Sequence, residues 1–189
     1  MNKVYNRVVK WNNARYPRVL DLKLTADLLR EEYLEWRDAK TEVNQLDGLC
    51  DIIYVALGAI WKANVDDGYL YSSEIAAGNA LQKYLHHEVI DPAYFIISHI
   101  DAIEYDMDTP LITSLQLIIT AAITQMSGLG LNYSECLDAL HIVCDSNASK
   151  SIKKTDPKVK ANDGDKGPFF IPPEPKLSAL LESAHARAN

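Results

Sequence analysis

Two pairs of acidic residues on consecutive helical stretches most constrain what this chain can fold into. They lie in residues 29–56, which read LREEYLEWRDAKTEVNQLDGLCDIIYVA. Glu32 and Glu35 are three residues apart. Asp47 and Asp51 are four apart, and either spacing places both side chains on one face of a helix. Apolar residues flank both pairs, so we expect the carboxylates to border a helix–helix contact.

Two interpretations of these acids compete. An acidic helix is usually a solvated face, and Glu31, Glu32 and Glu35 alone favour that interpretation. Asp47 and Asp51 weigh against it, because Asp is unfavourable inside a helix and both interrupt an apolar run. Buried carboxylates need a partner. Oxygen-rich clusters suit hard divalent ions, above all Mg²⁺, and facing helices of a bundle can build such a site.

The same segment resembles a known family. The pattern EExxE, followed after a short turn by DGLCDIIYV, is similar to the all-α nucleoside triphosphate pyrophosphohydrolases, the MazG-like group. The variant it most resembles is often labelled phosphoribosyl-ATP pyrophosphohydrolase-like and is common in bacteria and phages. The resemblance implies an all-α helix bundle that cuts a nucleoside triphosphate between its α and β phosphates.

The resemblance also implies roles for individual residues. Mg²⁺, or Mn²⁺ in its place, would be held by Glu32, Glu35, Asp47 and Asp51. Glu31 would be a further ligand or the base that orients the attacking water, and Glu35 shares the catalytic role.

One position departs from the family pattern. Many members carry a Glu three residues before the second Asp, where this chain has Gly48. Asp47, one residue earlier, is the substitute that we expect. The number of metal ions therefore stays open.

A second motif lies near the end of the chain. SNASK at 146–150 is followed by a Gly/Asp/Lys loop and then by KGPFFIPP at 166–173. Taken alone, these lysines indicate a solvated tail after a helix C-terminus, which favours cations. By resemblance to the same family, the motif implies a segment that folds back over the nucleotide phosphates. Asn147, Lys150 and Lys166 are then substrate-binding residues, since Lys suits phosphate.

Two weaker expectations complete the site. We expect the nucleobase to lie in an apolar pocket, against Trp11, Trp36 or Tyr54. Asp145 is a further candidate for the metal site.

Helical periodicity runs through the whole chain, and no period-2 strand pattern of any length is found. Helices are predicted over 4–14, 22–40, 46–64, 72–86, 91–105, 109–126 and 134–149, the last capped by Ser134. Residues after Pro175 are expected to form a short helix or to fray. We therefore expect an all-α bundle over 1–150, with extra or degenerate repeat helices at 66–130, and a substrate-covering segment and tail at 151–189.

Two segments of the chain resemble each other in sequence. A shift of 66 residues lays LCDIIYVAL at 49–57 on LQLIITAAI at 115–123 without gaps. In the second copy only Glu35 finds an acid, Asp101. We predict that residues 92–131 form a degenerate second helix pair, packed on the first as a partner subunit packs in a dimeric relative. A chance likeness between two apolar helices is the alternative.

Composition limits the partners. A net charge of -7 argues against broad contact with nucleic acid. Three cysteines, an odd and low number, indicate reduced thiols in a cytoplasmic protein. The family resemblance implies the cytoplasm of a bacterium or a phage-infected cell. The apolar stretch 111–126 is too short for a bilayer, which takes ~20 residues. We expect a nucleoside triphosphate as partner and a homodimer, or a monomer if the internal repeat forms a pseudo-dimer.

The function expected from these features is Mg²⁺-dependent cleavage of a ribo- or deoxynucleoside triphosphate to the monophosphate and pyrophosphate, in control of the nucleotide pool. A hydrolase of an alarmone or of phosphoribosyl-ATP is one alternative, and a non-catalytic helical interaction protein is another. The sequence leaves the base and the sugar open.

Overall fold

A computed structural model of the chain describes residues 1–64, 91–105, 110–150 and 166–188. All regular secondary structure in these ranges is helical, which confirms the all-α class. The helices are α1 (Asn2–Asn13), α2 (Leu22–Asp38), α3 (Glu42–Lys62), α5 (Pro92–Glu104), α6 (Leu111–Gly128), α7 (Tyr133–Ser149) and α8 (Glu174–Ala188). The helix predicted at 72–86 lies outside the described residues.

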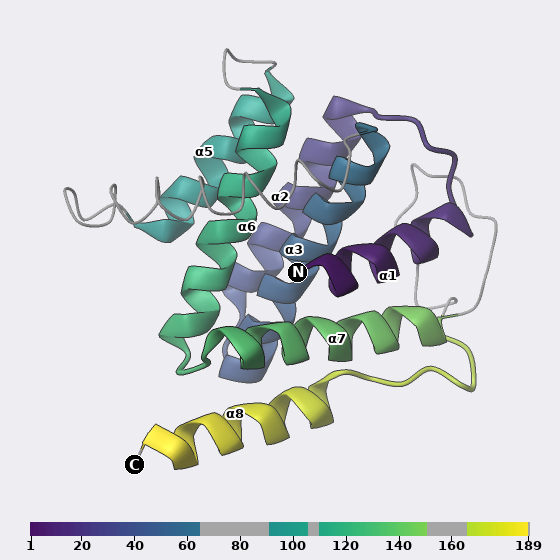
Figure 1. Cartoon of the computed structure of the whole chain (residues 1–189). Helices are drawn as coiled ribbons and strands as arrows, with labels where there is room; N and C mark the ends of the chain where they lie inside the picture. Colours follow the sequence, from purple (N-terminus) through teal and green to yellow (C-terminus); the bar gives the residue numbers. More distant parts are fainter. Residues whose placement is uncertain (65–90, 106–109, 151–165, 189) are drawn as a thin grey trace.

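Four helices, α2, α3, α5 and α6, form the body of the bundle (Figure 1). α3 packs on both α2 and α6, and α5 also packs on both of these helices. α3 is buried around most of its circumference, including Leu49, Ile52 and Ile53. A helix that is apolar all round belongs in a core, so α3 is the central element of the fold.

Three further helices, α1, α7 and α8, complete the fold, and in Figure 1 α7 and α8 cross the lower end of this body while α1 lies above α7. α7 packs on both α1 and α8, and all three contact α3. This arrangement brings the C-terminal end of α7 close to α1, because Trp11 Nε1 donates a hydrogen bond of 2.8 Å to the carbonyl of Asn147.

Helix caps explain where the observed boundaries differ from the predicted ones. The Thr41 side chain accepts from the Asn44 N–H at 3.2 Å, so α3 begins at Glu42, four residues before its predicted start. The predicted cap at Ser134 is wrong. Asn132 caps α7 instead, through a reciprocal capping box with Glu135 (3.0 and 2.8 Å).

The end of the chain forms a packed helix. α8 runs for 15 residues. Leu177, Leu181 and Ala184 recur at helical spacing and are buried against the rest of the protein. The burial of this stripe holds the start of α8, at Glu174, in a fixed place relative to α3 and α7.

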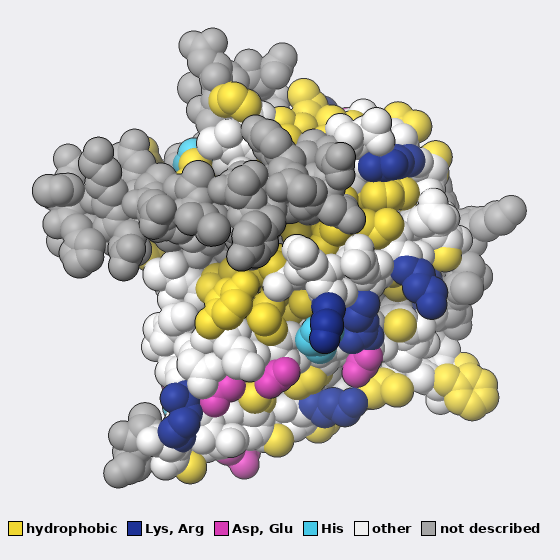
Figure 2. All heavy atoms as spheres, in the orientation of Figure 1, with side chains coloured by type: hydrophobic (Ala, Val, Ile, Leu, Met, Phe, Trp, Pro, Cys, Tyr) yellow, Lys and Arg dark blue, Asp and Glu magenta, His cyan; other side chains and the backbone are white. Residues whose placement is uncertain are grey.

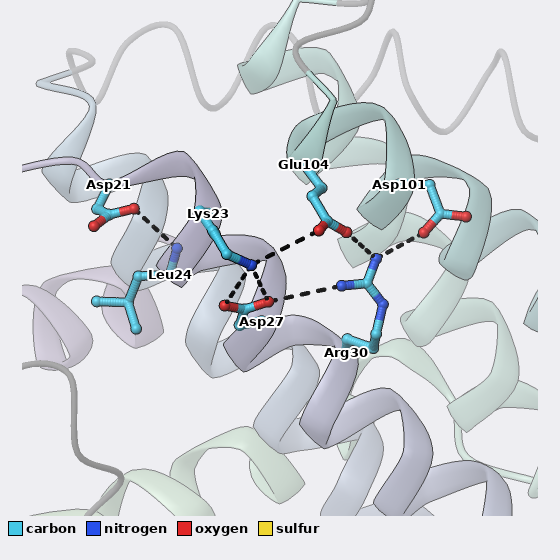
Figure 3. Close-up of polar contacts among 7 residues, drawn as sticks. All are labelled: Asp21, Lys23, Leu24, Asp27, Arg30, Asp101 and Glu104. Carbon is cyan, nitrogen blue, oxygen red and sulfur yellow. Dashed lines mark hydrogen bonds and ion pairs between the residues drawn. The ribbon is translucent and has the colours of Figure 1, made fainter.

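The helices α5 and α6 pack on α2 and α3. α5 contacts α2 and α6 contacts α3, so each helix lies against its equivalent. Charged side chains join α2 to α5 (Figure 3). Arg30 Nη2 lies 2.7 Å from Asp101 Oδ1 and 2.6 Å from Glu104 Oε2. A two-fold relation between the pairs stays a hypothesis.

The surface and the apolar helices bear on the expected partners without testing them. On the face shown in Figure 2, Lys and Arg side chains are interleaved with Asp, Glu and His over the lower half of the described part. Among the described helices, α3 and α6 are long and apolar enough to cross a membrane, α6 being longer than the predicted apolar stretch. The core helix of a soluble protein has the same length and composition.

Candidate functional site

A cavity of about 450 Å³ lies between α1, α2, α3, α7 and the segment that leads into α8. Nine of the twelve candidate residues line it: Trp11, Glu32, Glu35, Asp47, Asp51, Tyr54, Asn147, Lys150 and Lys166. Glu31 is solvent-exposed and, like Trp36 and Asp145, does not line the cavity. Two motifs that are about a hundred residues apart in sequence therefore meet at one place.

The acidic wall of the cavity comes from α2 and α3. These helices run side by side, so Glu32 and Glu35 on α2 share a wall with Asp47 and Asp51 on α3. Glu32 is only 6% exposed. Asp47 Oδ1 is buried and has no hydrogen-bond partner among the residues that the structure describes.

The electrostatics of Asp47 show that this wall carries an excess of negative charge. Its pKa is raised to about 6, first because the carboxyl is buried and next because of the negative charge of Glu174. Lys150 opposes this rise, while Glu32 and Glu35 add to it. A cation placed here would relieve the repulsion.

Gly48 is explained by the closeness of α2 and α3. A Cβ at this position would lie 2.9 Å from both Cα and Cβ of Trp36. No side chain fits there, so the Glu of the family pattern has no room in this chain. Trp36, one of three aromatic residues considered for the base pocket, packs at this contact and does not line the cavity.

The basic wall comes from the end of α7 and from Lys166. Lys150 Nζ donates to Asn147 Oδ1 at 2.6 Å. Arg15 Nη2 donates to the Lys150 carbonyl at 3.1 Å, which ties this end of α7 to α1. The Ile171 N–H donates to Ser149 Oγ at 2.9 Å and fixes the segment carrying Lys166 beside α7.

The far end of the cavity is aromatic. Trp11 stacks edge-on against Tyr54 and lies tilted against Tyr16, with centroid separations of 5.6 and 5.7 Å. On α3, Tyr54 and Gly58 follow the two Asp residues on the cavity side. At 1.5 Å per residue, roughly 10 Å separate Asp51 from Gly58 along the helix. The cavity can therefore hold a ligand with one charged end and one flat, apolar end.

Six polar lining residues were not assigned to the site by the sequence analysis: Asn12, Tyr16, Thr25, Lys62, Ser146 and Glu174. Lys62 lies eleven residues after Asp51, three helical turns on the same face of α3, so periodicity could have found it. Burial lowers the pKa of its ammonium group. Asn12 is buried, and its Nδ2 donates to the Val8 carbonyl at 3.0 Å. No sequence pattern signalled Glu174.

Asp145, the weaker candidate for the metal site, is placed elsewhere. It forms an ion pair with Arg7 of α1 and is not a lining residue of the cavity.

The donor set has the chemistry that suits a hard divalent cation, namely several carboxylates around one cavity with a buried, unpartnered oxygen on Asp47. Within the described ranges, no group of three His, Cys, Asp or Glu side chains is already drawn together as a metal site.

Comparisons of the chain with protein-family models, with curated proteins and with solved structures find no match. The case for a function therefore rests on the geometry of the cavity and on the resemblance carried by its two motifs.

Proposed function

We propose that this protein is a divalent-cation-dependent hydrolase that cleaves nucleoside triphosphates to nucleoside monophosphates and pyrophosphate. One observation supports this most: one cavity is lined by carboxylates, by lysines and by aromatic side chains, the groups that a metal, a phosphate chain and a base require.

The acidic wall would bind the cation. Glu32, Glu35, Asp47 and Asp51 line the cavity from two helices and supply only oxygen donors, which Mg²⁺ and Mn²⁺ prefer. When bound, such an ion neutralises charge on phosphate oxygens and lowers the pKa of a coordinated water.

The basic wall would bind the leaving pyrophosphate. Lys150 is held by Asn147 at the end of α7, and Lys166 approaches from the following segment. Their ammonium groups would take up the negative charge that develops on the β-phosphate as its bond to the α-phosphorus breaks.

Glu35 is the best candidate for the base. It lines the cavity and is exposed enough to reach a water, whereas Glu31 is outside the cavity. The water oxygen would attack the α-phosphorus, its proton would pass to the Glu35 carboxylate, and the bond to the bridging oxygen would break. A base must lie within hydrogen-bond reach of that water, ~2.6–3.2 Å.

The aromatic end would hold the nucleobase. Trp11 and Tyr54 line the cavity, with the Arg15 guanidinium 4.4 Å from the centroid of the Trp11 ring. Trp11 is fixed in place by its hydrogen bond to the Asn147 carbonyl. This bond links base binding to the residues that would bind phosphate.

A panel of ribo- and deoxynucleoside triphosphates tests the proposal, with product analysis in Mg²⁺, in Mn²⁺ and in EDTA. The expected result is metal-dependent formation of monophosphate and pyrophosphate, with ¹⁸O from labelled water entering the monophosphate. Label in the pyrophosphate would contradict attack at the α-phosphorus. Adding phosphoribosyl-ATP and an alarmone to the panel separates the alternative hydrolases.

A non-catalytic interaction protein makes a different prediction. It releases no product from any member of the panel, and its melting temperature does not respond to divalent cations. That pair of results would reject the proposed function.

A further inference from the structure

The acidic wall carries no side chain at the position where many members of the family that the chain resembles have a Glu. Gly48 stands at that position, and the backbone of Trp36 occupies the space of any side chain. Asp47 faces the cavity instead, with a buried oxygen that lacks a hydrogen-bond partner in the described structure.

A carboxylate from the far end of the chain reaches the same cavity. Glu174 is the first residue of α8 and lines the cavity at its solvent-exposed mouth. It lies three residues before Leu177 and seven before Leu181, so it shares the helix face that is buried against α3 and α7.

The conformation of the backbone around Glu174 is restrained by its neighbours. Prolines at 173 and 175 flank it, and proline restricts the backbone at the start of a helix. The Pro173 carbonyl accepts from the N–H groups of Lys176 and Leu177 at 3.1 and 3.0 Å. The carboxylate therefore starts from a fixed point beside the cavity.

An acidic residue at a helix N-terminus is common, because the helix dipole favours it there, and would need no further explanation. The neighbours of Glu174 are what is unusual. Glu174 comes from the far end of the chain and lines the same cavity as Asp47, Glu32 and Glu35. Facing a buried carboxylate with another anion is unfavourable unless a cation joins them.

We propose that Glu174 supplies an oxygen to the cation-binding site and takes the role that a side chain at Gly48 cannot fill. This inference rests on the proposed function, since it concerns the same site. The C-terminal helix would then complete the site beside the two central helices, and the cation would hold the segment 166–174 closed over the phosphates.

A titration of the full-length protein with Mn²⁺ tests the inference without measuring activity. Electron paramagnetic resonance of the free ion reports how much Mn²⁺ is bound. The variants are Glu174→Gln, Glu174→Ala, Asp51→Asn and the matched control Glu182→Gln. Glu182 lies on the same helix, is exposed, and contacts only Ser178 among the contacts described (3.1 Å).

The expected result is an Mn²⁺ affinity reduced on the order of tenfold in both Glu174 variants and in Asp51→Asn, with Glu182→Gln like the wild type. In EDTA, the melting temperature of Glu174→Gln should equal or exceed that of the wild type, because the substitution removes an anion from beside Asp47. This control separates loss of a ligand from loss of the fold.

The outcomes separate the two proposals. If Asp51→Asn loses affinity while both Glu174 variants stay within threefold of the wild type, the role of Glu174 is rejected and the proposed function stands. If the wild type binds no Mn²⁺, both are rejected. If neither Asp51 nor Glu174 matters although Mn²⁺ binds, the ion binds elsewhere and the site itself is rejected.

Discussion

The helix pairs α2–α3 and α5–α6 are arranged alike in the bundle, but their acidic side chains have different surroundings. In the pair α5–α6, Asp101 is held in an ion pair with Arg30 at 2.7 Å. In the pair α2–α3, Asp47 keeps a buried oxygen without a hydrogen-bond partner in the described structure and carries a raised pKa. An acid neutralised by the protein serves packing, whereas an acid left unsatisfied beside a cavity is available to a ligand.

The equivalent positions strengthen this contrast. A shift of 66 residues replaces Asp47 by Thr113, which is exposed, and Asp51 by Leu117. It replaces Glu32 by Ser98, whose hydroxyl donates to the Phe95 carbonyl at 2.8 Å. The second pair therefore keeps the packing role of its helices and none of the three other carboxylates, as expected if only the first pair binds a ligand.

The largest expected effect is on activity at the buried acid Glu32. Glu32→Gln should lower kcat/KM at least about 100-fold, because a neutral amide binds a divalent cation more weakly than a carboxylate does and does not balance its charge. Ser98→Ala, at the equivalent place in the second pair, should leave kcat/KM unchanged. Steady-state kinetics with the preferred substrate measure both, and equal effects would contradict the division of roles.

The next effect is on stability at the helix contacts. Gly48→Ala should destabilise the protein by about 2–4 kcal/mol, because the new Cβ meets Trp36 backbone at 2.9 Å. Ser114 is the equivalent residue and is fully buried, and its hydroxyl lacks a partner in the described structure. Ser114→Ala should be neutral or stabilising by up to about 1 kcal/mol. Urea denaturation of both variants checks this, and a harmless Gly48→Ala would show that the two helices are not in close contact.

A third effect is on pH dependence. Since the pKa of Asp47 is raised from 3.8 to about 6, the native protein keeps a proton that the unfolded chain has already released between these values. The contribution of protonated Asp47 to the stability of the metal-free protein should therefore be complete below pH ~4. The free energy of unfolding should then fall by on the order of 2 kcal/mol as the pH rises to about 6. Asp47→Asn should remove this fall.

Denaturation of the wild type and Asp47→Asn in EDTA, from pH 4 to pH 7, isolates the contribution of this group as a difference between two curves. Mg²⁺ should restore stability to the wild type above pH 6 and have little effect on the variant. If the free energies of unfolding of the two proteins changed in parallel with pH, ionisation of Asp47 would not destabilise the folded protein.

The smallest effect concerns the ion pairs that join the two pairs of helices. Arg30→Met keeps the aliphatic stem but removes the contacts with Asp101 and Glu104 (Figure 3). Partly exposed ion pairs contribute about 1 kcal/mol or less, so thermal denaturation should show a small loss. Turnover should not change, and a large fall in kcat would mean that the second pair takes part in the site.

The fold was predictable where the signal was local. Helical periodicity identified α2, α3, α5, α6 and α7, but their starts depend on caps such as Thr41 and Asn132, which lie outside the apolar pattern. The packing of α8 was not predictable, because Leu177 and Leu181 are buried only once α3 and α7 are in place.

The site was predictable to the extent that its motifs are contiguous. Neighbouring acids such as Glu31 and Glu32 look alike in sequence, and only the rotation of α2 against α3 decides that Glu32 faces the cavity. Asn12 and Glu174 come from chain segments that reach the cavity through tertiary packing. No periodicity within either segment could have revealed that approach.

We propose that the acids of α2 and α3 that line the cavity form a hydrolytic site. The most direct test is the initial rate of pyrophosphate release in Mg²⁺ by the wild type, by Asp51→Asn and by Asp138→Asn, an exposed Asp on α7 that does not line the cavity. We expect pyrophosphate release by the wild type and by Asp138→Asn in Mg²⁺, and none in EDTA. Asp51→Asn should keep its fold and release pyrophosphate at a rate at least about 100-fold lower. Near-normal release by a folded Asp51→Asn would contradict the proposal.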